Sequence, residues 1–234
     1  MKKILTIICC LLLTANSAMN AKTLVVYYSY TNNCLDIVQT LTSQIEADVL
    51  RIEPADKTQK YEANNYAIGT QLLNAIKAAP NDAASYPAID PVSITDLTPY
   101  QTIIIVTPLW WSQMAAIMQT YLFHHGAEMA GKNIGLIVSS ASSSISGVVS
   151  DCKRLVPEGK YFSENLWINN SNRSKRSTLI QNWLTAINYN AVTAIETPST
   201  QSPTTGNYYS ISGQRLSQTP KRGIFIADGK KIIK

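Results

Sequence analysis

Polar and small residues follow an apolar run near the N-terminus and provide the groups that an anion site needs. The run Thr23–Tyr28 reads TLVVYY, and an amphipathic pattern begins at Leu35. Between them stand Ser29, Tyr30, Thr31, Asn32, Asn33 and Cys34. A phosphate at such a strand-to-helix junction gains from unpaired N–H groups, from the helix dipole and from hydroxyl donors. The alternative is that Thr31, Asn32 or Asn33 only caps the helix.

Two adjacent tryptophans follow a second apolar run. The run Thr102–Thr107 reads TIIIVT and leads into Pro108, Leu109, Trp110, Trp111 and Ser112. Two large aromatic rings just past a strand end are suited to stacking on a flat heteroaromatic ring. The alternative is that one tryptophan anchors the core, although both rings cannot easily point into the same small core.

A loop of small residues follows a third apolar run, Ile134–Ser139. It reads SSASSSISG and contains Ser139, Ser140, Ala141, Ser142 and Gly147. Small side chains allow a backbone to approach a ring edge closely. An ordinary connection between a strand and a helix is the alternative.

The elements that must position these loops alternate along the chain. Strands are predicted at 23–28, 49–52, 102–107 and 134–139, with a weaker one at 161–168. Helices are predicted at 35–45, 64–79, 114–123, 145–155 and 174–187. Strict alternation with apolar strands favours an α/β fold, a doubly wound parallel sheet of five strands with helices on both faces. Ligands of such sheets lie at the carboxyl ends of the strands, where all three loops begin.

The two ends of the chain differ from this body. Residues 1–21 have two lysines, a short apolar run and then small residues, which predicts a secretory signal peptide and an exported product, periplasmic or secreted. An uncleaved anchor is the alternative, but the apolar run is short for a membrane span.

We assign residues 22–190 to one domain and the Thr/Ser/Pro-rich residues 191–206 to a linker. Residues 207–234 predict a small β-hairpin around Asp228-Gly229.

Charge and cysteine content exclude several classes of protein. Residues 22–190 carry 12 Lys and Arg against 13 Asp and Glu, so the positive net charge lies at the chain ends and no nucleic-acid partner is expected. Only Cys34 and Cys152 follow the predicted signal peptide, too few for a disulfide framework. Cys34 at a helix start is either a reactive thiol or, more simply, a small apolar residue. No metal site is expected.

Residues 22 to about 190 resemble the flavodoxin family, and within it the group whose middle loop reads P-x-W-W. The family's phosphate loop usually reads Ser/Thr-x-Thr-Gly-Asn-Thr; Ser29, Thr31 and Asn33 match it, whereas Asn32 replaces the glycine and Cys34 the last threonine. Pro108, Trp110 and Trp111 match the middle loop, and Ser140, Ala141 and Ser142 replace glycines of the third loop. The resemblance implies strand order 2-1-3-4-5.

The resemblance also implies that FMN is the cofactor. Ser29, Thr31, Asn33 and the N–H of Cys34 would bind its phosphate, Trp110 and Trp111 its ring, and the Ser139–Ser142 backbone the opposite ring edge. The cofactor would carry the redox chemistry, so no side chain is expected to be catalytic. The implied function is electron transfer or reduction of quinone-like acceptors, with a small-molecule donor or acceptor, or a redox protein, as partner.

The C-terminal tail has a resemblance of its own, and the function has an alternative. The tail from Tyr208 to Lys234 resembles short C-terminal segments on secreted proteins of Bacteroidota, which act as sorting signals in some of them. The functional alternative is an exported, non-enzymatic binding module that has lost flavin. The replaced glycines and Cys34 favour that alternative, and no membrane span is expected after signal removal.

Overall fold

The computed structural model describes residues 22–62 and 66–190, and four short strands within residues 208–233. The chain divides into two units, residues 1–195 and 196–234, and each is described here by itself. The predicted signal peptide at 1–21 and the predicted linker at 191–206 lie outside the described residues. No helix within the described residues is both long and apolar enough to cross a membrane.

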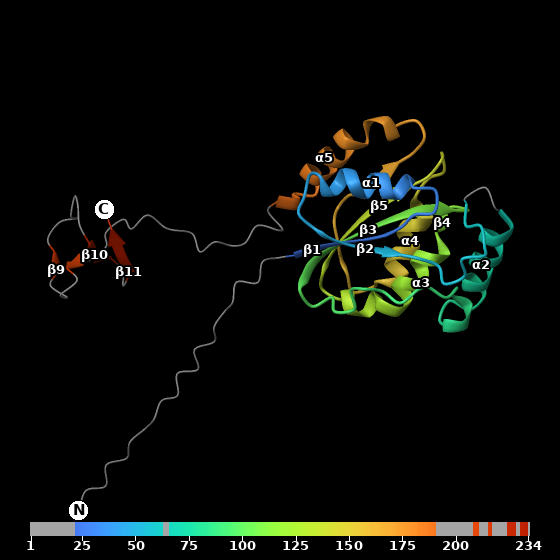
Figure 1. The fold of residues 1–234 in the computed structure, drawn as a ribbon, viewed down its shortest axis with the longest axis horizontal. Coiled ribbons are helices and arrows are strands. Elements are labelled where there is room, and N and C mark those ends of the chain that lie inside the picture. Colours follow the sequence, from blue (N-terminus) through green and yellow to red (C-terminus); the bar gives the residue numbers. More distant parts are fainter. Residues whose placement is uncertain are drawn as a thin grey trace, which may run out of the picture. The chain divides into compact units, whose positions relative to one another are not determined.

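A parallel sheet forms the centre of the first unit (Figure 1). Its strands are β1 (Lys22–Tyr28), β2 (Asp48–Ile52), β3 (Tyr100–Trp110), β5 (Asn133–Ser139), β6 (Lys160–Tyr161) and β7 (Leu166–Ile168). The order is β2-β1-β3-β5-β6, and β7 also pairs with β5. The predicted order 2-1-3-4-5 is therefore confirmed, because β6 and β7 together occupy the fifth position.

Helices cover both faces of this sheet, as the alternation of elements predicts. The helices are α1 (Asn33–Thr42), α2 (Tyr66–Ala78), α3 (Ala116–His125), α4 (Ser146–Leu155) and α5 (Arg176–Ala186), with single turns η1 (Ala83–Ser85), η2 (Gly126–Met129) and η3 (Arg173–Lys175). Figure 1 shows α1 and α5 on one face and α3 and α4 on the other. Side chains of each strand alternate between two cores, so Val25 packs with α1 and α5 whereas Leu24 packs with α3 and α4.

The weak strand predicted at 161–168 is in fact two short strands. β6 pairs with the start of β5, at Asn133 and Ile134, and β7 pairs with its end, from Ile137 to Ser139. Between them the Glu164 carbonyl accepts a hydrogen bond from the Trp183 indole at 2.9 Å instead of continuing the ladder. The Trp183 ring packs over Gly135, where an added Cβ would lie 3.0 Å from it. One bulky side chain of α5 therefore divides the edge strand.

β3 extends beyond the predicted strand end at Thr107. It continues to Trp110, turns through Trp111 and Ser112, and pairs antiparallel with β4 (Gln113–Met114). The two turn residues have φ of 47° and 64°, as a two-residue hairpin turn of type I′ requires. The expected loop 107–112 is therefore a tight β-hairpin, because β4 supplies partners for the backbone of Leu109 and Trp110.

The second unit contains four short antiparallel strands. They are β8 (Tyr208–Ser210), β9 (Arg215–Leu216), β10 (Ile224–Ala227) and β11 (Lys230–Ile233), in the order β11-β10-β8-β9. β10 and β11 pair in register from Ile224–Ile233 to Ala227–Lys230. The predicted turn at Asp228-Gly229 lies outside the described residues.

Candidate functional site

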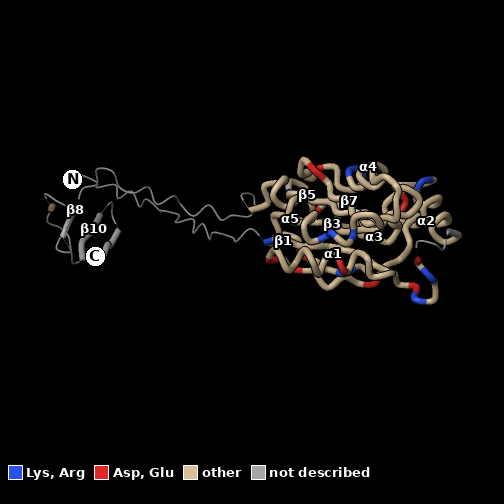
Figure 2. Tube along the Cα trace, turned by 90° about the horizontal axis from the view of Figure 1, so that it is seen from above, with Lys and Arg blue, Asp and Glu red and all other residues tan. Residues whose placement is uncertain are grey.

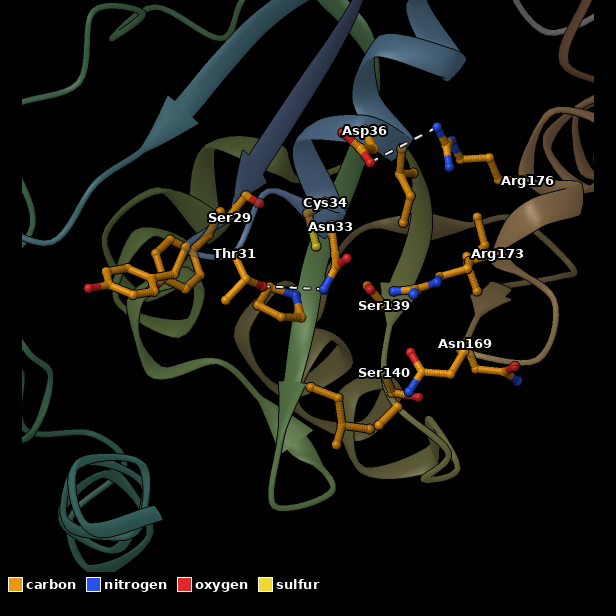
Figure 3. A pocket seen from close by; sticks show the side chains of 18 of the residues that line it. Ser29, Thr31, Asn33, Cys34, Asp36, Ser139, Ser140, Asn169, Arg173 and Arg176 are labelled. Atoms are coloured by element: carbon orange, nitrogen blue, oxygen red, sulfur yellow. Dashed lines mark hydrogen bonds and ion pairs between the residues drawn. The ribbon is translucent and has the colours of Figure 1, made fainter. Parts of the chain in front are cut away.

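The carboxyl ends of β1, β3, β5 and β7 surround a cavity of about 830 Å³ (Figure 3). Its size falls within the range of small-molecule sites. The predicted site residues that line it are Ser29, Tyr30, Thr31, Asn33, Cys34, Pro108, Leu109, Trp110, Ser139, Ser140 and Ala141. The structure thus brings the three loops, which are far apart in sequence, around one space.

The first loop caps α1 through Ser29 and not through the side chain at the N-cap position. Asn32 occupies the N-cap position of α1 with φ 65°, and its side chain makes no capping hydrogen bond. Instead the Ser29 hydroxyl accepts a hydrogen bond from the Leu35 N–H at 3.2 Å. The Asn33 side chain donates to the Thr31 hydroxyl at 3.2 Å. The loop therefore presents hydroxyls and helix-start N–H groups together, as an anion site needs.

Cys34 is buried under this loop, with 1% of its surface exposed. Its side chain belongs to the core that α1 and α5 share, and burial raises the pKa of its thiol far above the usual value. A thiol of this kind stays protonated and inert, which agrees with the small-apolar-residue interpretation.

Aromatic side chains also line the cavity. The Trp110 ring is buried, contacts Tyr28 edge-on at 6.0 Å between centroids, and lies parallel to Tyr61 within 8° at 6.4 Å. Tyr30 meets Tyr61 at 6.1 Å. The buried Tyr28 hydroxyl has no hydrogen-bond partner among the described residues, and burial raises its pKa. Tyr28 is one of the residues that line the cavity, and a buried hydroxyl without a partner can be satisfied by a bound water or ligand.

Five predicted site residues do not line this cavity, namely Asn32, Trp111, Ser112, Ser142 and Gly147. Trp111 sits on the β3–β4 turn with 55% of its surface exposed, and it lines a separate cavity with Gln119 and Arg154. Trp110 ends β3, whereas Trp111 lies in the turn with φ 47°, and the two residues line different cavities. The two tryptophans therefore do not share one ring site.

The third loop is fastened to β7 rather than free. The Ser140 N–H donates to the Ile168 carbonyl at 3.1 Å, and the Asn170 N–H donates to the Ala141 carbonyl at 3.1 Å. The Ser140 hydroxyl accepts from the Trp167 indole at 2.7 Å and donates to the Ser143 carbonyl at 3.0 Å. Because these bonds occupy the Ser140 side chain, it serves to hold the loop.

The sequence prediction missed several lining residues. They are Tyr28, Asp36, Ile37, Tyr61, Glu62, Ile168, Asn169, Asn170, Arg173, Ser174 and Arg176. The polar run Asn169-Asn170-Ser171-Asn172 after β7 follows the same end-of-strand rule as the other loops, so it was a usable signal. Figure 3 shows Arg173 and Arg176 near the start of α1, where Asp36 also lies, and Glu62 follows the lining residue Tyr61 in the sequence. The lining therefore combines aromatic side chains with two arginines and two acidic residues.

Comparisons with known proteins agree with this fold. A family model described as flavodoxin matches residues 22–187. A putative flavoprotein from Bacteroides eggerthii DSM 20697 is 24% identical, with a TM-score of 0.55 over 72% of this chain and 99% of that one. A flavoprotein from Lactobacillus acidophilus NCFM, solved in complex with FMN, is 20% identical, with a TM-score of 0.53 over 67% of this chain and 99% of that one. No curated protein matches the chain.

Proposed function

The chain belongs to the flavodoxin family, and from this premise we propose that it binds FMN non-covalently and acts in electron transfer or as a flavin-dependent reductase of quinone-like small acceptors. The observation that carries the proposal is one cavity that joins an anion-binding loop to an aromatic wall. A phosphorylated compound with a flat ring requires both ends at once.

The residues present fit this cofactor. Asn32 replaces the family's glycine but adopts φ 65°, a backbone conformation that asparagine tolerates better than most residues. Cys34 replaces a threonine, yet its side chain is buried, so its backbone N–H remains the relevant donor. Tyr28 lines the cavity and its buried hydroxyl has no described partner, so a ligand that reaches it would satisfy that group.

When FMN is bound, its isoalloxazine ring supplies the redox chemistry, and the protein contributes binding, orientation and electrostatics. Ser29, Thr31 and Asn33 would hold the phosphate together with the start of α1. Trp110 and Tyr61 would shield the ring from water, and the backbone of the Ser139–Ala141 segment would approach its far edge. No side chain needs to act as an acid or base.

The charge distribution gives modest support to a reductase over a carrier of electrons between proteins. Carriers that dock onto charged redox partners often have one strongly acidic surface. Residues 22–190 are nearly neutral, and Figure 2 shows acidic and basic residues interspersed over this unit. A small-molecule acceptor needs no such surface, so quinone reduction with loaded protein is the assay to make after binding is established.

The binding proposal is tested by titrating the purified protein with FMN and following absorbance and flavin fluorescence. We expect saturable quenching that weakens in a Ser29→Ala, Thr31→Ala double variant. Thr185→Ala is the matched control, because its hydroxyl bonds only within α5, to the Gln181 carbonyl, and lies outside the cavity. Absence of binding at high micromolar FMN would contradict the proposal and favour a binding module without flavin.

We also propose that the protein is exported, on the pattern of residues 1–21. Expression in a Gram-negative host followed by fractionation and intact mass measurement tests this. Export predicts a product in the periplasm or medium whose mass corresponds to cleavage after Ala18 or Ala21. A full-length cytoplasmic product would contradict it.

A further inference from the structure

Arg173 is the cationic side chain of the cavity that has no partner within the described protein. It belongs to η3, and Figure 3 shows its side chain reaching toward Asn33 and Ser139. Its guanidinium forms no hydrogen bond or ion pair with any residue that the structure describes. Arg176, the other lining arginine, donates to the Thr40 hydroxyl at 3.1 Å and lies 4.0 Å from the Asp36 carboxylate.

The backbone that carries Arg173 is held in place by its neighbours. The Arg173 N–H donates to the Asn169 carbonyl at 2.9 Å. The Asn172 side chain accepts from the Asn169 N–H at 2.8 Å and donates to the Trp167 carbonyl at 3.2 Å. Because Asn170 is bonded in turn to Ala141, this segment and the third loop form one connected wall. The arginine therefore projects from a fixed base rather than from a loose loop.

A cation would favour phosphate binding beside the first loop. The first loop, Ser29–Cys34, contains no basic residue, and the first turn of α1 carries the acidic Asp36, which also lines the cavity. A phosphate dianion placed there would lie near the Asp36 carboxylate, whose ion pair with Arg176 spans 4.0 Å. A positive charge near that position would offset the Asp36 carboxylate, and Arg173 is the lining arginine whose guanidinium has no partner among the described residues.

We propose that Arg173 is the counter-ion of the ligand's phosphate group and that it makes the site selective for phosphorylated flavin over riboflavin. This inference rests on the proposed function and deepens it. Arginine suits the task because its guanidinium stays charged and matches the geometry of phosphate oxygens with two donors. The attraction between the Arg173 guanidinium and the phosphate strengthens FMN binding and leaves the contacts to the flavin ring unchanged.

The test compares FMN and riboflavin titrations of wild-type protein with Arg173→Gln, Arg173→Lys and Lys175→Gln. Lys175 is the matched control, because it is an exposed cation of the same η3 turn and does not line the cavity. At low salt, we expect Arg173→Gln to weaken FMN binding about tenfold, the order for a partly exposed charge-assisted hydrogen bond. Riboflavin affinity should stay within about twofold, because riboflavin carries no phosphate.

The salt dependence provides a second readout. Wild-type affinity for FMN should fall as ionic strength rises, because salt screens the Arg173–phosphate attraction. That dependence should flatten in Arg173→Gln, persist in Lys175→Gln and be partly retained in Arg173→Lys. A merely structural role for Arg173 would weaken riboflavin and FMN equally.

The outcomes separate the two proposals. If wild-type protein binds FMN and Arg173→Gln binds it equally well, the role of Arg173 is wrong and the proposed function stands. Equal weakening of both flavins also overturns the role of Arg173. If wild-type protein binds neither flavin, both proposals fail together.

Discussion

The Ser112 carbonyl oxygen occupies the position that a Cβ on Gly147 would need. Gly147 lies in the first turn of α4, and Ser112 lies on the turn between β3 and β4. The glycine therefore allows the hairpin that carries Trp110 to pack against α4. Its role is structural, in contrast to the ring contact expected from the sequence.

We expect Gly147→Ala to destabilise the protein by about 1–3 kcal/mol, because a backbone atom cannot yield to the added methyl group. Gly69→Ala is the matched control. An added Cβ there would lie 3.6 Å from the Trp111 side chain, an ordinary contact, and alanine favours the interior of α2 by about 0.5–1 kcal/mol. Urea unfolding of the two variants should show changes of opposite sign. A neutral Gly147→Ala would contradict the close approach.

The two tryptophans should differ sharply on substitution. Trp110→Ala removes a buried ring and should cost about 3–5 kcal/mol, whereas Trp111→Ala removes a largely exposed one and should cost less than about 1 kcal/mol. Urea unfolding followed by circular dichroism measures both. Equal losses would mean that Trp111 is packed in solution.

The same pair tests which ring faces the flavin. Trp110→Phe should weaken FMN binding, because Trp110 lines the cavity, and Trp111→Phe should leave it unchanged. Fluorescence titration gives both affinities. Weaker binding in Trp111→Phe alone would restore the expectation, drawn from the sequence, that Trp111 contacts the ring.

Tyr28→Phe should stabilise the ligand-free protein or leave it unchanged, because it removes a buried hydroxyl with no described partner. With FMN, the same variant should bind about 2- to 10-fold more weakly, the value of one hydrogen bond. Tyr121→Phe is the control, since its hydroxyl is also buried and unpartnered but does not line the cavity. Equal effects of the two variants on FMN affinity would contradict a Tyr28 contact.

Asp151 should make stability depend on pH. Burial raises the pKa of its carboxyl, despite the Met114 N–H at 2.9 Å and the nearby Arg154. The folded state therefore holds this proton more tightly than the unfolded state, so the Asp151 contribution to stability falls as pH rises from the usual aspartate range through the raised pKa. Asp151→Asn should remove that fall. Thermal unfolding of both proteins across this pH window checks it, and parallel profiles would contradict it.

Much of the fold could be predicted because its determinants are local. The apolar runs at Thr23–Tyr28 and Thr102–Thr107 are typical of strands in a sheet that is covered on both faces. The helical patterns between the strands favour parallel pairing. The edge strand was less predictable, because its division depends on Trp183, which comes from α5 and reaches the Glu164 carbonyl.

That three polar or aromatic loops leave the same edge of one sheet follows from the sequence alone, because a parallel sheet gathers the carboxyl ends of its strands. The tertiary structure alone decided which side chains enter the cavity. Trp110 faces it and Trp111 does not, because the β3–β4 turn places them on opposite sides. Arg173 faces Asn33 from a segment about 140 residues away, since α1 and α5 pack on the same face of the sheet. No local pattern encodes that juxtaposition, which arises only when the helices pack.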